Sequence, residues 1–203
     1  QFNLSLQKLN YTPINLLAHS IQTYRSDEFH EVVNKGKIKG LINKSGVSLY
    51  QKNEIEEILR YPYLPEIVQI PINILDTRLY TDGTIKKLYD LNIEIQARSI
   101  FLQGLFYLTE EFWKEKFSDG YIYLKKLKDL AKYVNLSLSE FSLIWVNSLK
   151  EISNIIIGVE NRYHLESHLN SLGKNISDDV FEEAIKIDYT NNKILDPSKW
   201  KIK

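Results

Sequence analysis

The chain has 203 residues, of which 43% are hydrophobic and 26% are charged, as is typical of a globular domain with a hydrophobic core. Lys and Arg together number 26, and so do Asp and Glu, which gives a formal net charge of zero. This balance provides no bulk electrostatic attraction to nucleic acid. No apolar run reaches the roughly 18 residues that a membrane helix needs, and the first residues lack the pattern of a secretory signal peptide.

The chain contains no Cys and no Met. The lack of Cys excludes disulfides, thiol catalysis and Cys-based zinc sites, and it fits a cytoplasmic protein. Because a natural reading frame begins with Met, we expect this sequence to be a fragment of a longer protein. The acidic residues Asp178, Asp179, Glu182 and Glu183 near the C-terminus show no ligand geometry that can be defended, so we expect no metal site.

Short apolar runs alternate with longer amphipathic segments along the chain. The apolar runs predict strands over residues 14–19, 44–50, 67–70, 93–99 and 154–157. Helical spacing of apolar residues predicts helices over residues 26–35, 53–59, 84–92, 121–134, 137–149, 164–172 and 180–187. Asn53 and Ser137 are the expected N-caps of two of these helices.

This alternation predicts an α/β fold in which parallel strands are joined by crossover helices. An open doubly wound sheet and a closed barrel share the pattern. No Gly-x-Gly-x-x-Gly or Walker-type motif follows a strand, which weakens the hypothesis of an open nucleotide-binding sheet. Five βα units are too few to close an eight-stranded barrel, so the pattern favours an incomplete barrel.

Ligands of both architectures bind beyond the carboxyl ends of the strands. His19 ends the first predicted strand, where an imidazole can hydrogen-bond a substrate carbonyl or serve only a structural role. The next two strands end on Ser48 and on Gln69, which is followed by Asn73. These side chains suit a primary amide, although each could also cap backbone groups. Arg98 and Ser99 end the fourth strand.

Gly158 ends the fifth strand, and the helix that follows it could bind phosphate at its N-terminus. An ordinary βα turn is the alternative. Arg162 or His164 could add positive charge there, whereas the negative charge of Glu160 would disfavour a phosphate.

Four segments together resemble the aldo/keto reductase family from its fourth strand to its end. The matching segments are Leu4–His19 (LSLQKLNYTPINLLAH), Gly36–Lys39 followed by Gly46–Ser48 (GKIK and GVS), Val68–Arg78 (VQIPINILDTR) and Ile93–Leu105 (IEIQARSIFLQGL). They occur in the family's order and spacing and cover nearly the whole chain. The forms Arg98-Ser99 and Asp196–Trp200 (DPSKW) are similar to a bacterial subgroup of the family.

The resemblance implies a (β/α)8 TIM barrel that is incomplete here, with about five βα units corresponding to strands 4–8. We therefore expect residues 1–203 to form a single domain, the C-terminal portion of the barrel, with residues 174–203 as a tail packed on it. The family reduces aldehydes and ketones with NADPH, less often NADH, so the cofactor expected from the resemblance is NADP or NAD.

The resemblance also implies roles for individual residues. His19 matches the pocket histidine beside the catalytic Tyr, and Ser48 and Gln69 match groups that hold the nicotinamide carboxamide. Arg98 stands where many members place a Tyr that stacks on the nicotinamide. The remaining cofactor-binding residues implied are Ser99, Leu102 and Gly104 on the pyrophosphate side, and Gly158, Arg162, His164 and His168 in the segment that contacts the adenosine phosphate.

Three departures limit these expectations. Leu49 replaces the Asn that follows the Ser in the family. His164 and His168 stand where Arg and Asn are common, so the preference for NADPH does not carry over. The family's catalytic Asp, Tyr and Lys would lie upstream of Gln1.

The leading hypothesis is an NAD(P)H-dependent oxidoreductase that acts on a small carbonyl substrate, with the catalytic Asp, Tyr and Lys expected upstream of this chain. The alternative is a non-catalytic cofactor-binding or regulatory module on the same fold. An isomerase or aldolase is disfavoured because no strand ends on a Lys. Since an incomplete barrel exposes sheet edges, we expect it to be completed by an N-terminal segment or in a homo-oligomer.

Overall fold

A computed structural model describes residues 2–187 and 189–200. Residues 1, 188 and 201–203 therefore lie outside the described residues. The predicted domain 1–203 includes all of them, and the predicted tail 174–203 includes 188 and 201–203. The strands are β1 (Ile14–Ala18), β2 (Ile42–Ser48), β3 (Ile67–Pro71), β4 (Glu94–Arg98) and β5 (Asn154–Ile155). The helices of the first half are α1 (Phe2–Leu9), α2 (Ile21–Tyr24), α3 (Asp27–Ile38), α4 (Lys52–Ile58), α5 (Arg78–Thr81) and α6 (Thr84–Asp90).

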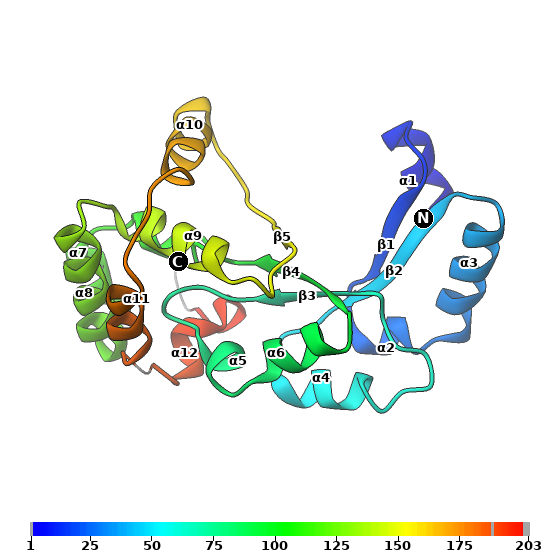
Figure 1. The fold of residues 1–203 in the computed structure, drawn as a ribbon, viewed down its shortest axis with the longest axis horizontal. Helices are drawn as coiled ribbons and strands as arrows, with labels where there is room; N and C mark the ends of the chain where they lie inside the picture. The colour runs from blue at the N-terminus through cyan, green and yellow to red at the C-terminus, as the bar shows by residue number, and fades with distance from the viewer. Residues whose placement is uncertain (1, 188, 201–203) are drawn as a thin grey trace. The chain divides into compact units, whose positions relative to one another are not determined.

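Six further α-helices and two 3-10 helices complete the described chain (Figure 1). They are η1 (Leu105–Tyr107), α7 (Glu110–Lys116), α8 (Ser118–Tyr133), α9 (Leu138–Ser148), α10 (Arg162–Ser171), α11 (Asp178–Ile185), α12 (Asn192–Leu195) and η2 (Pro197–Lys199). Every strand and helix that the sequence predicts is present. The sequence pattern did not predict α1, α2, α5, α7, α12 or the two 3-10 helices.

The strands form a five-stranded sheet in the order of the sequence, β1-β2-β3-β4-β5. The pairs β1/β2 and β2/β3 are parallel, which confirms the predicted α/β class. β2 begins at Ile42, two residues before the predicted start, and β5 spans only two residues. Among the described helices none is both long enough and apolar enough to cross a membrane.

The chain divides into two compact units. The first contains the residues up to Ile70 together with Lys87–Gln96, and the second contains Pro71–Lys86 and the residues from Ala97 onward. The expectation of a single domain stays a prediction.

Close backbone approaches shape the first unit. The helix α3 begins after Ser26, whose side chain accepts a hydrogen bond from the Phe29 N–H at 3.2 Å. A Cβ on Gly36 of α3 would lie 2.4 Å from the Ile42 side chain of β2. A Cβ on Gly46 would lie 2.2 Å from the Ile67 carbonyl oxygen. Glycine is therefore required at Gly46, where the atom met belongs to the backbone, whereas at Gly36 the Ile42 side chain would have to shift.

The predicted N-cap Asn53 is wrong. The helix α4 begins at Lys52, and the cap is Gln51. The Glu54 carboxylate accepts hydrogen bonds from the N–H groups of Gln51 (3.0 Å) and Tyr50 (2.6 Å), so a capping box two residues upstream of Asn53 satisfies the free donors.

Buried helices organise the second unit. The predicted N-cap Ser137 is confirmed, and it forms a capping box with Glu140. Phe141 of α9 packs against Phe181 of α11, with ring centroids 5.5 Å apart. Trp200, near the end of the described chain, packs on Phe117 with centroids 5.1 Å apart.

We predict that Gly46→Ala lowers the free energy of unfolding by about 2 kcal/mol, because the added methyl group overpacks the contact with the Ile67 carbonyl. Chemical denaturation followed by circular dichroism measures this change. Gly173→Ala is the matched control, because a Cβ there meets nothing within 4 Å, and a change within about 0.5 kcal/mol is expected. Unchanged stability in Gly46→Ala would contradict the close approach.

Candidate functional site

Three of the predicted site residues stand at neighbouring strand ends in the first unit. Ala18 pairs with Val47, and Ser48 pairs with Gln69, in the parallel register of β1, β2 and β3. His19 directly follows Ala18, so the structure places His19, Ser48 and Gln69 in one row across the three strands. Ser48 ends β2, His19 follows the end of β1, and Gln69 lies two residues before the end of β3.

The environments of these residues differ. His19 is exposed and lines a cavity of about 890 Å³, which Thr23 also lines. The Gln69 amide Nε2 donates to Gln96 Oε1 at 3.3 Å. Leu49 is fully buried, and its N–H donates to the Gln69 carbonyl at 2.9 Å. Leu49 therefore belongs to the core, and only its backbone takes part in this row.

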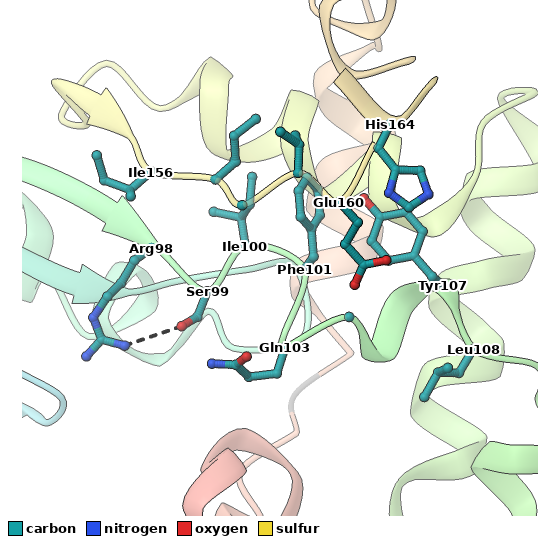
Figure 2. Close-up of a pocket in the computed structure, with 14 residues that line it drawn as sticks. Arg98, Ser99, Ile100, Phe101, Gln103, Tyr107, Leu108, Ile156, Glu160 and His164 are labelled. Carbon is teal, nitrogen blue, oxygen red and sulfur yellow. Dashed lines mark hydrogen bonds between the residues drawn. The ribbon is translucent and has the colours of Figure 1, made fainter. Parts of the chain in front are cut away.

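A cavity of about 690 Å³ lies within the second unit (Figure 2). Its walls come from the segment after β4 and from the loop between β5 and α10. The lining residues are Arg98, Ser99, Ile100, Phe101, Gln103, Gly104, Tyr107, Leu108, Ile156, Ile157, Gly158, Val159, Glu160 and His164.

The backbone after β4 is strained. Ser99, Leu102, Gln103 and Gly104 have φ angles of 59°, 46°, 51° and 83°. The left-handed conformation costs a residue other than glycine about 1–3 kcal/mol and is concentrated at functional sites. We therefore regard the loop from Ser99 to Gly104 as the central feature of the cavity.

Buried side chains from distant parts of the sequence hold this loop. Asn73 is almost fully buried, and its Nδ2 donates to the Ser99 carbonyl at 3.2 Å. Ser142 of α9 donates its hydroxyl to the Ile100 carbonyl at 2.8 Å and accepts from the Ile74 N–H at 3.2 Å. These bonds fix the carbonyl groups of the loop on its buried side.

The loop also offers donors to an anion. Within the described part of the chain, the N–H groups of Ile100, Phe101 and Gln103 have no hydrogen-bond acceptor. The Arg98 guanidinium lines the same cavity and donates from Nη1 to Ser99 Oγ at 3.3 Å, as Figure 2 shows. Free backbone N–H groups near a left-handed turn together with an arginine suit phosphate oxygens.

Aromatic rings form another part of the wall. Tyr107 stacks on His164, with centroids 5.3 Å apart and planes 17° apart. The buried His168 stacks on Phe101 at 4.7 Å, and its Nε2 lies 3.2 Å from the Tyr107 hydroxyl. The exposed part of this group offers a flat apolar surface to a planar ligand.

Burial and neighbouring charges favour the uncharged forms of Tyr107 and His168. Burial raises the pKa of Tyr107, and the negative charges of Glu160 and Glu140 act in the same direction. Burial lowers the pKa of His168, and the charge of His164 lowers it further. At neutral pH the Tyr107–His168 pair therefore contributes no positive charge to the cavity.

The predicted cofactor residues of the second unit divide into two sets. Those that line the cavity are Arg98, Ser99, Gly104, Gly158 and His164. Those that do not are Leu102, Arg162 and His168. Leu102 and His168 are buried, whereas the Arg162 side chain is 90% exposed and pairs with Glu166. The assigned roles of both sets stay predictions.

Gln103, Tyr107 and Glu160 line the cavity but were not predicted from the sequence to be site residues. Gln103 lies between two predicted residues, Leu102 and Gly104, and could have been included on that ground. Tyr107 gave no signal among 13 scattered tyrosines. Across residues 2–187 and 189–200, no three His, Asp or Glu side chains gather into a group that could hold a metal ion.

Comparisons with known proteins agree with this architecture. The sequence model of the Aldo/keto reductase family matches residues 1–188. No curated protein matches the chain. The aldo-keto reductase AKR11C1 from Bacillus halodurans, solved in a holo form, is 18% identical with a TM-score of 0.71, over 91% of this chain and 62% of that one.

Two further structures are similar. The thermostable aldo-keto reductase Tm1743, solved with the inhibitor epalrestat, is 19% identical with a TM-score of 0.68, over 91% of this chain and 64% of that one. The glycerol dehydrogenase AKR11B4 from Gluconobacter oxydans is 16% identical with a TM-score of 0.69, over 90% of this chain and 61% of that one. The chain spans less than two-thirds of the length of these structures, and the likeness concerns the fold, which is that of an incomplete TIM barrel. With the family's sequence model matched from residue 1 to residue 188, the chain belongs to the aldo/keto reductase family.

Proposed function

We propose that the protein to which this chain belongs is an NAD(P)H-dependent reductase of aldehydes or ketones, and that the cavity of the second unit binds the ADP part of the cofactor. The single observation that carries this proposal is the strained loop from Ser99 to Gly104, because it leaves backbone donors free beside Arg98. An oxidoreductase activity is in keeping with the family.

The residues present fit a dinucleotide. The pyrophosphate would accept hydrogen bonds from the N–H groups of Ile100, Phe101 and Gln103 and from the Arg98 guanidinium. The adenine ring would pack against the aromatic surface of Tyr107 and His164. A cavity of about 690 Å³ has the size of a small-molecule site.

Taken by itself, the first unit carries groups that suit a nicotinamide and a carbonyl substrate. When bound, the reduced nicotinamide supplies a hydride to the substrate carbonyl. Ser48 and Gln69 would hydrogen-bond the nicotinamide carboxamide, whose donors and acceptors match a hydroxyl and an amide. His19 would hydrogen-bond the substrate carbonyl oxygen and orient it.

The second candidate is a non-catalytic cofactor-binding module. It shares with the first the proposal that the cavity of the second unit binds the ADP part of the cofactor. It predicts dinucleotide binding without turnover of any carbonyl substrate. Steady-state oxidation of NADH or NADPH with a panel of aldehydes and ketones separates the two candidates.

We predict that Gly104→Ala weakens dinucleotide binding about tenfold, because a side chain at a φ angle of +83° strains the loop. Gly83→Ala is the matched control: Gly83 has a φ angle of +79°, and a Cβ at either glycine meets nothing within 4 Å. We expect both variants to lose about 1 kcal/mol of stability. Titration calorimetry with NADH and NADPH should show weaker binding only for Gly104→Ala, and equal affinities in the two variants would contradict a phosphate-binding role for the loop.

We predict that His19→Ala lowers kcat about 100-fold while dinucleotide affinity changes less than twofold, because a residue that orients the carbonyl acts on the reacting substrate. Stopped-flow turnover and binding titrations of the whole protein measure the two quantities. Gln22→Ala, at an exposed residue three positions along the chain, should leave both unchanged. Full turnover in His19→Ala would remove this residue from the mechanism.

A further inference from the structure

We propose that Glu160 makes the cavity of the second unit selective for a dinucleotide with a free ribose 2′-hydroxyl, so that the protein prefers NADH to NADPH. The inference rests on the proposed function, because it assumes that this cavity binds the ADP part of the cofactor. It goes further by naming the cofactor and the residue that selects it.

Glu160 stands at the aromatic part of the cavity. It lines the cavity together with Tyr107 and His164, and Figure 2 shows the three side chains gathered away from Arg98 and Ser99. The charge of Glu160 also contributes to the raised pKa of Tyr107. A nucleoside whose base packs on Tyr107 and His164 would therefore present its ribose near a carboxylate.

No Lys or Arg of the cavity wall forms an ion pair with this carboxylate. Within the described chain, Glu160 forms no ion pair, and Arg98 is the only Lys or Arg that lines the cavity. Arg162, two residues away, points elsewhere: its Nε donates to Glu166 at 2.6 Å. The Tyr107–His168 pair is uncharged at neutral pH.

The N-terminus of α10, the helix that follows Glu160, also has fewer free donors for a phosphate. At the start of α10, the Asn161 side chain already accepts the His164 N–H at 2.9 Å. One of the donors that a helix N-terminus could offer to an anion is thereby occupied.

These features have opposite effects on the two cofactors. A carboxylate accepts hydrogen bonds from the vicinal hydroxyls of a ribose, and acidic residues select NAD in this way on other folds. The 2′-phosphate of NADPH carries a charge of about −1.5 to −2 at neutral pH. It would meet the like charge of Glu160 without an arginine to neutralise it.

The test is calorimetric titration of the whole protein with NADH, with NADPH, and with ADP-ribose and its 2′-phosphate. The two shorter probes lack the nicotinamide and report on the ADP half alone. We expect the wild-type protein to bind NADH at least tenfold more tightly than NADPH, and ADP-ribose more tightly than its 2′-phosphate. In Glu160→Gln, which keeps the size and removes the charge, both ratios should fall about tenfold.

Glu182→Gln is the matched control. It makes the same change of net charge at an exposed residue of α11 that does not line the cavity, and it should leave both ratios unchanged. Equal or tighter binding of NADPH by the wild-type protein, or unchanged ratios in Glu160→Gln, would overturn the inference and leave the proposed function in place. If neither dinucleotide binds, the proposed function and the inference both fail.

Discussion

The left-handed backbone at Ser99, Leu102, Gln103 and Gly104 is the constraint on which the cavity of the second unit depends. Three of these residues carry side chains, so the conformation costs free energy that contacts elsewhere must offset. Asn73 and Ser142 bind the carbonyl groups of Ser99 and Ile100 from the buried side. The loop is thereby held with backbone N–H groups that have no acceptor within the described chain, and such preorganisation would lower the cost of binding the proposed pyrophosphate.

The chemistry of the wall changes along the cavity. Arg98 and the loop provide positive potential, whereas Tyr107 and His164 provide an aromatic surface and Glu160 a negative charge. An ADP group has the same succession, from diphosphate to ribose and adenine. This correspondence supports the proposals that the cavity binds the ADP part of the cofactor and that Glu160 selects NADH over NADPH.

The fold was largely predictable because its strands and helices follow local rules. Apolar runs of four to seven residues gave the strands, and the capping box at Ser137 marked the start of α9. The same rules failed at α4, where Asn53 was the expected cap and Gln51 with Glu54 forms the actual one. Both starts fit the local sequence, and the hydrogen bonds of the Glu54 carboxylate decide between them.

The sequence by itself determined the family, the α/β class and most of the polar residues at the strand ends, including His19, Ser48 and Gln69. It left open which cofactor residues share a cavity: Gly158 and His164 line it with Arg98, whereas Leu102 and His168 turn into the core. Only the tertiary structure decided this, and it also brought in Tyr107 and Glu160. The physical reason is that the loop is held by Asn73 and Ser142, residues 26 and 42 positions away from their partners, and such contacts leave no periodic signal in the sequence.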